Sequence, residues 1–212
     1  MLGCMTFSSA ERRRLADLFL ELGPDAPTLC EGWTTKDLAV HLLLRETNPM
    51  AAAGIIAPAA QGLLDKATRK EEQRDYADIV RDWGEGPGRF NPVRYIDPVM
   101  NTAEHFIHHE DVRRGGGVVE PRDFSAAVNG QLYKTLKMIA PRMLAKSAVP
   151  VILLPTDQPR IVTADKRGVS PDGDAVVRVS GDVGELLLWV YGREAVEVTV
   201  DGNPEDIHRS SL

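Results

Sequence analysis

Apolar residues recur at intervals of three and four along most of the first 145 or so residues, which is the spacing of one face of an α-helix. The first such stretch, "SSAERRRLADLFLELGP" at residues 8–24, ends at a Gly-Pro pair that stops a helix. Ser8 and Glu11 have the spacing of a capping box, so we expect Ser8 to cap this helix.

A second helix is predicted in "WTTKDLAVHLLLRE", with Thr34 as N-cap and Asp37 three residues later. His41 lies beside the apolar stripe of this helix, within one turn of Arg45. Asp97 and Pro98 have the residue types of an N-cap and a first helical position. Helices are also predicted at about 59–69, 75–83, 101–114 and 125–146.

The pattern changes near residue 147. "VPVILLPTD", "RIVTAD", "AVVRVSG" and "VEVTVDG" are short β-branched runs between turn residues, and "GDVGELLLWVYGR" between the last two has helical length. We therefore predict a helical bundle over residues 1–147 and a small α+β domain over residues 148–212.

Composition excludes several classes. The formal net charge of -6 argues against a nucleic-acid partner, and no apolar run approaches the roughly 20 residues of a membrane span. No secretion signal is recognisable at the N-terminus, and Cys4 and Cys30 make no disulfide framework, so we expect a cytoplasmic protein. Its oligomeric state is left open.

The segment "NTAEHFIHHEDVRRGGG", residues 101–117, holds three of the five histidines. On a helix, Glu104 faces the same way as His108, and His105 the same way as His109, so either pair could chelate a divalent metal. His41 on another helix is a natural third ligand, because bundles build metal sites from inward side chains of facing helices. The competing interpretation is a solvated helix face rich in histidines and acids.

Two stretches, "PTLCEGWTTKDLAVHL" and "EHFIHHEDVRRG", resemble the metal-helix signatures of the mycothiol-dependent maleylpyruvate isomerase-like family. This family belongs to the DinB-like metal-binding four-helix bundles, and the chain is especially similar to a subgroup described only as metal-binding. The tail "VRVSGDVGELLLWVYGREAVEVTVDGNPE" resembles the sterol-carrier-like domain that follows many of these bundles. Residues 48–91 match only loosely.

The resemblance implies a metal site at His41, Glu104 and His108, and so selects the Glu104 pair over the His105 pair. His105 stands where relatives often have an aromatic or apolar residue, which keeps the alternative pair open. Two imidazoles and one carboxylate suit zinc, although nickel, iron or cobalt would also fit. His109 and Asp111 are candidates for orienting a ligand through its other ring nitrogen, or are simply polar residues near a helix end.

The resemblance also implies mycothiol as a thiol cosubstrate, activated at the metal for attack on a small electrophile. Arg193 is a candidate catalytic clamp for substrate carboxylates, or a helix-end cation. We expect Cys30 to be a small buried residue in a turn, and Trp33 to pack on the first turn of its helix. Two functional classes remain open: a thiol-dependent isomerase or transferase, and a non-catalytic ligand-binding module with a structural metal. The substrate itself is not identified by any residue.

Overall fold

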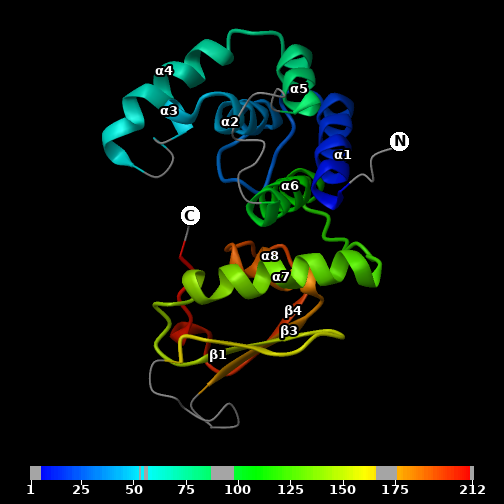
Figure 1. The fold of residues 1–212 in the computed structure, drawn as a ribbon, viewed down its shortest axis with the longest axis vertical. Coiled ribbons are helices and arrows are strands. Elements are labelled where there is room, and N and C mark those ends of the chain that lie inside the picture. The colour runs from blue at the N-terminus through cyan, green and yellow to red at the C-terminus, as the bar shows by residue number, and fades with distance from the viewer. Residues whose placement is uncertain (1–5, 53, 55–56, 87–97, 166–175, 211–212) are drawn as a thin grey trace. The chain divides into compact units, whose positions relative to one another are not determined.

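The computed structural model describes residues 6–52, 54, 57–86, 98–165 and 176–210. The chain forms two compact units, Met1–Val118 and Val119–Leu212. The first is helical and the second contains a sheet, as Figure 1 shows. The predicted fold class, a helical region followed by a small α+β domain, is confirmed.

The first unit is built around the packed helices α1 (Phe7–Leu22), α2 (Thr35–Thr47), α5 (Tyr76–Glu85) and α6 (Pro98–Arg113). Between α2 and α5 lie the short α3 (Pro49–Ala52), the 3-10 turn η2 (Pro58–Ala60) and α4 (Gln61–Glu71). α1 packs on α6 and α5, and α2 packs on α5. The core includes Phe19 of α1 and Trp83 of α5, whose ring centroids are 6.1 Å apart in an edge-on arrangement.

The caps of the first two helices show one wrong prediction and one confirmed. α1 is capped by Thr6, whose hydroxyl accepts from the backbone N–H of Ser9. Ser8 is therefore not the cap, because its hydroxyl is used elsewhere, 2.8 Å from Nδ1 of His105. Thr34 and Asp37 form the predicted reciprocal capping box of α2. Pro98 begins α6, while Asp97 lies outside the described residues.

The loop between α1 and α2 is fastened to the C-terminal end of α6. The backbone N–H of Leu29 donates to the carbonyl oxygen of Asp111 at 2.9 Å. Gly115 allows this approach, because a Cβ placed there would lie 2.0 Å from the carbonyl oxygen of Pro27. A Cβ placed on Gly116 or Gly117 would have no atom within 4 Å. Among the three consecutive glycines, only Gly115 is therefore required for the close contact with Pro27.

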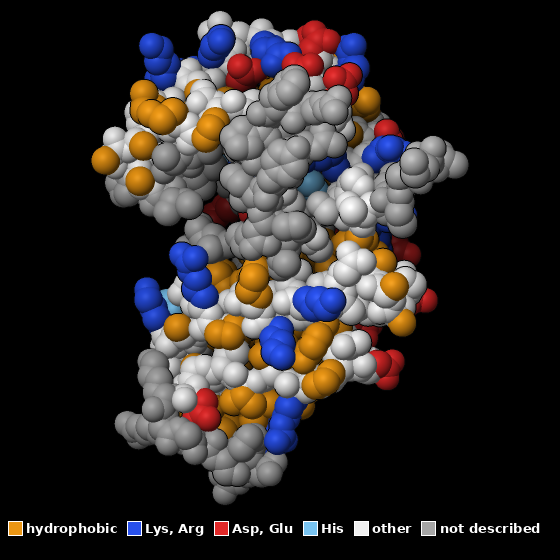
Figure 2. All heavy atoms as spheres, in the orientation of Figure 1, with side chains coloured by type: hydrophobic (Ala, Val, Ile, Leu, Met, Phe, Trp, Pro, Cys, Tyr) orange, Lys and Arg blue, Asp and Glu red, His pale blue; other side chains and the backbone are white. Residues whose placement is uncertain are grey.

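α4 lies at the periphery of the first unit and has no buried residue. Figure 2 shows basic and acidic side chains intermingled over α4 and α5, beside apolar side chains at the α3–α4 end. That surface therefore carries no extended patch of one sign. None of the described helices is both long and apolar enough to cross a membrane.

The second unit places two helices on one face of a four-stranded sheet (Figure 1). The helices are α7 (Ala126–Met143) and α8 (Val183–Val190), and the strands are β1 (Val151–Pro155), β2 (Ile161–Thr163), β3 (Val177–Gly181) and β4 (Val198–Asp201). The strand order is β2-β1-β3-β4, in which β1 and β3 are parallel and the outer pairs antiparallel. All eight residues of α8 are buried, since α7 and the sheet cover it.

The division between the units falls at residues 118 and 119, whereas the sequence pattern placed it at 147 and 148. The difference is α7, which resembles the bundle helices in its pattern. Its apolar face, with Leu132, Leu136 and Ile139, is buried, and its main contact is with α8. α7 therefore folds with the sheet and not with the helices that precede it.

Candidate metal centre

The histidines and acids of α6 are divided between different neighbours. Glu104 and His108 lie near His41 of α2. His105 and His109 contact residues of α1 instead, through Ser8 and Glu11 respectively. Residues i and i+4 share a helix face, so the two candidate pairs diverge as the spacing predicts.

His41, Glu104 and His108 offer one ligand atom each within 4.8 Å of one another. Nε2 of His108 is 3.4 Å from Oε2 of Glu104, close to the separation of about 3.4 Å between two ligands on a tetrahedral zinc. The rings of His41 and His108 have centroids 5.7 Å apart. The three residues of the predicted metal set are thus brought together, each of them partly exposed.

Electrostatics leaves His41 and Glu104 in the form a metal requires. Burial, aided by the nearby charges of His108 and Arg45, lowers the pKa of His41 to about 4, so its ring is neutral at neutral pH. Burial alone would raise the pKa of Glu104, but the hydrogen bond and charge of His108, with Arg45, lower it to about 2. One neutral imidazole and one carboxylate are therefore available as ligands.

His108 behaves differently because acids surround it. Burial opposes its protonation, but hydrogen bonds with Asp111, Cys30 and Glu104 raise the pKa of His108 well above 6.5. A metal bound to Nε2 would have to displace a proton.

Nδ1 of His108 lies 2.9 Å from Oδ2 of Asp111, and Asp111 is fully buried. This is the carboxylate–histidine arrangement that orients metal-binding imidazoles in proteins. The thiol of Cys30 donates to the same carboxylate oxygen at 3.3 Å. Cys30 lies in the bend before α2, as expected, but it is only partly buried, so the expectation of a buried cysteine is wrong. Its contact with Asp111 was not foreseen.

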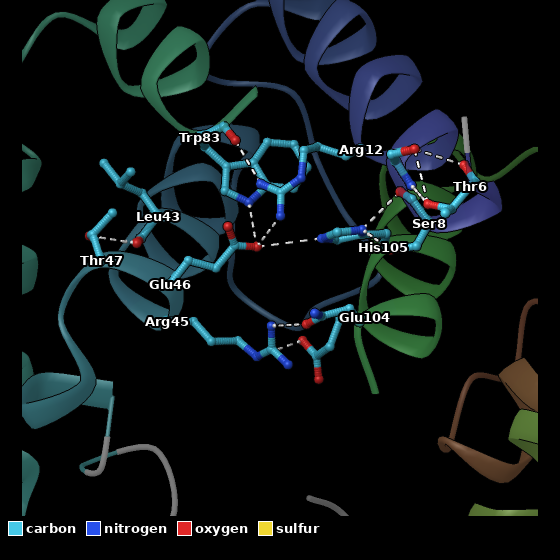
Figure 3. A network of polar contacts seen from close by, with 12 residues as sticks. Thr6, Ser8, Arg12, Leu43, Arg45, Glu46, Thr47, Trp83, Glu104 and His105 are labelled. Carbon is cyan, nitrogen blue, oxygen red and sulfur yellow. Dashed lines mark hydrogen bonds and ion pairs between the residues drawn. The ribbon is translucent and has the colours of Figure 1, made fainter. Parts of the chain in front are cut away.

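Two further side chains border the cluster. The ring of Trp33 lies with its centroid 5.1 Å from that of His41, so it flanks the site. Nε of Arg45 lies 3.5 Å from Oε2 of Glu104, and Figure 3 shows the guanidinium facing that carboxylate. The sequence had placed Arg45 one turn from His41, and that spacing was the signal for its position.

His105 and His109 have structural partners instead. Figure 3 shows His105 between Ser8 and Glu46, with Nε2 3.4 Å from Oε1 of Glu46. Nδ1 of His109 is 2.9 Å from Oε2 of Glu11. Among the described residues, neither histidine belongs to a group of three potential ligands. With His105 2% and His109 6% exposed, the interpretation of this face as solvated is wrong.

Arg193 lies in the turn after α8 in the second unit, where its Nη1 donates to the carbonyl oxygen of Tyr191 at 2.9 Å. Its role as a clamp for substrate carboxylates stays a prediction.

The fold and the cluster define a two-unit protein with histidines and a carboxylate gathered in a helical first unit and a small α+β second unit. Residues 8–93 match the model of the mycothiol maleylpyruvate isomerase N-terminal domain family. The matched family is the one that the sequence resemblance predicted. The match includes His41 but ends before α6, so it does not extend to Glu104 and His108.

The same fold occurs in a solved mycothiol-dependent maleylpyruvate isomerase, at 17% identity and a TM-score of 0.58, over 94% of this chain and 91% of that one. A histidine-to-alanine mutant of such an isomerase gives 18% identity and a TM-score of 0.57, with the same coverage. The search of curated proteins found no significant match. At these identities the structural likeness establishes the fold.

Proposed function

We propose that the protein binds a divalent metal, zinc by preference, at His41, Glu104 and His108, and activates mycothiol there for attack on a small electrophile. The observation that carries the proposal is the convergence of these three side chains from two helices. The family match and the names of the similar structures support the choice of thiol.

The chain's own residues divide the work. Bound by two imidazoles and one carboxylate, the metal would keep an open position at which a thiol loses its proton near neutral pH. Asp111 holds the ring of His108 in a fixed orientation through Nδ1. Trp33 supplies an apolar wall beside His41.

The proposed reaction needs neither an oxidant nor a reductant. The thiolate sulfur adds to one carbon of an activated double bond, and the π electrons move toward the activating carbonyl. Rotation about the resulting single bond, followed by expulsion of the thiolate, gives the cis–trans isomer. If a proton is added to the neighbouring carbon instead, the thiol stays attached and the outcome is S-transfer.

The first test is metal content by elemental mass spectrometry. We expect about one equivalent in the wild type and little in His41→Ala, Glu104→Ala and His108→Ala. His105→Ala is the matched control from the same helix, and His208→Ala, an exposed residue of the second unit, controls for adventitious binding. Circular dichroism should show that the helices persist in each variant. Full metal content in the three ligand variants would refute the site.

The second test follows mycothiol consumption with chlorodinitrobenzene and isomerisation of maleylpyruvate. Activity with either substrate should disappear on chelation and return with zinc. Thiol loss that chelation leaves unchanged would refute metal activation. Stoichiometric metal without either activity would favour a ligand-binding module with a structural metal.

A further inference from the structure

Arg45 lies beside the candidate metal ligands, but the chemistry proposed above gives it no role. It follows His41 by one turn of α2, so both side chains leave the helix on the same face. Its Nε is 3.5 Å from Oε2 of Glu104, and its Nη1 is 3.5 Å from Oδ1 of Asn101. Figure 3 shows the guanidinium directed at Glu104.

Other arginines of the first unit are held much more tightly. Nη2 of Arg12 lies 2.6 Å from Glu46, and its Nη1 donates to the carbonyl oxygen of Trp83 at 2.7 Å. Nε of Arg114, 1% exposed, donates to Glu110 at 2.7 Å. Both contacts of Arg45 are at the long limit of a hydrogen bond. The side chain of Arg45 is 20% exposed. Arg45 is positioned, but its five N–H donors are poorly used.

The charge on Arg45 is balanced by Glu104 as long as that carboxylate has no stronger partner. A dication bound to Glu104 would take over this negative charge. Arg45 would then face a centre of its own sign, and an anion would become its favoured partner. The planar guanidinium suits a carboxylate, which can accept two parallel hydrogen bonds from it.

We propose that Arg45 is an anion-binding residue of this centre, and that a metal at His41, Glu104 and His108 unmasks it for a carboxylate group of the electrophile. The inference rests on the proposed function, because it requires the metal. Metal and carboxylate are then coupled ligands, so that each tightens the binding of the other by the same factor. Arg45 therefore selects acidic over neutral electrophiles and favours metal binding before substrate.

The test is calorimetric titration with succinate, which is not an electrophile, on metal-free and zinc-loaded protein. We expect zinc-loaded wild type to bind succinate at least about tenfold more tightly than both metal-free wild type and zinc-loaded Arg45→Gln. Arg45→Lys should fall between, since it keeps the charge and loses the planar fork. Arg81→Gln, at an exposed arginine of α5 paired with Asp78, should match the wild type. Succinamide, the neutral analogue, should not distinguish the variants.

Zinc content measured on the same samples separates the two proposals. If the wild type takes up no zinc, the proposed function fails and this inference fails with it. If zinc is bound but Arg45→Gln binds succinate as the wild type does, only the inference is overturned. Equal affinity of metal-free and zinc-loaded wild type would overturn the unmasking, and a loss of zinc alone in Arg45→Gln would make Arg45 a support for Glu104.

Discussion

His108 and Asp111 are joined by a 2.9 Å contact between Nδ1 and a fully buried carboxylate oxygen, one turn apart on α6. The contact leaves Nε2 of the ring directed toward Glu104, at 3.4 Å. It also links the loop before α2 to the cluster, because Cys30 donates to the same oxygen. The orientation of the candidate ligand thus depends on two elements distant in sequence.

Asp111→Asn should weaken metal binding by about 10- to 100-fold, because the amide keeps the shape of the carboxylate but loses its charge. Competition with a chromophoric chelator measures the affinity. Asp17→Asn, at an exposed position of α1, is the matched control and should bind as the wild type does. Unchanged affinity in Asp111→Asn would remove Asp111 from the site.

His41 should make the metal-free protein sensitive to acid. Burial and the charges of His108 and Arg45 lower the pKa of His41 to about 4, from 6.5 in the unfolded chain. Between these pH values the unfolded chain binds the proton and the folded chain does not, so stability is lost as the pH falls through this window. At 1.36 kcal/mol per pH unit the loss is about 3 kcal/mol.

Urea unfolding of chelator-treated protein, followed by helical circular dichroism near pH 7 and near pH 4, checks this prediction. In His41→Gln the loss of stability between the two conditions should shrink by about 2–3 kcal/mol. His208→Gln, which removes an exposed histidine, should lose as much as the wild type. An unchanged pH dependence in His41→Gln would show that its ring titrates normally.

The buried pair of Arg12 and Glu46 should be costly to break. Its atoms are 2.6 Å apart with Glu46 only 3% exposed, and Trp83 and His105 contact the same carboxylate oxygen. Glu46→Ala leaves the largely buried guanidinium of Arg12 without its carboxylate partner and should destabilise the protein by about 3–5 kcal/mol. Urea denaturation measures the change.

Arg81→Ala breaks the exposed pair with Asp78 and is the control for that experiment, with an expected cost below about 1 kcal/mol. Similar costs for the two variants would mean that the buried network contributes no more than a surface pair.

Gly115→Ala should destabilise the first unit by about 1–3 kcal/mol or more, because the new methyl group would meet the carbonyl oxygen of Pro27 at 2.0 Å. Backbone must move to relieve the overlap, and the loop bearing Cys30 and Trp33 would shift with it. Gly116→Ala meets no atom within 4 Å and serves as the matched substitution. Equal unfolding midpoints for the two variants would contradict the close approach.

Local features were well predicted from the sequence. The helical spacing and the β-branched runs gave the element types in both units, and the capping box at Thr34 is present. These features depend on residues a few positions apart. The assignment of α7 to the first domain differed from the structure because its partner, α8, follows only at residue 183, and periodicity does not reveal which element covers a helix face.

The same limit applies to the candidate site. Spacing alone did not distinguish the pair of Glu104 and His108 from the pair of His105 and His109. Both pairs were also compatible with a solvent-exposed helix face. Their separation depends on what lies opposite α6: His41 near one pair, and the buried acids Glu11 and Glu46 beside the other. Those neighbours come from elements far away in the chain, so only the three-dimensional arrangement distinguishes the pairs.

The contact between His109 and Glu11 has a consequence for how this chain can diverge. The two side chains are buried and contact each other from separate helices, so replacing one removes a buried polar contact of the other. Substitutions at positions 109 and 11 should therefore occur together in evolution. Descendants that lose the histidine should lose the acid as well, in favour of a matched apolar pair, while the exposed positions of α1 vary independently.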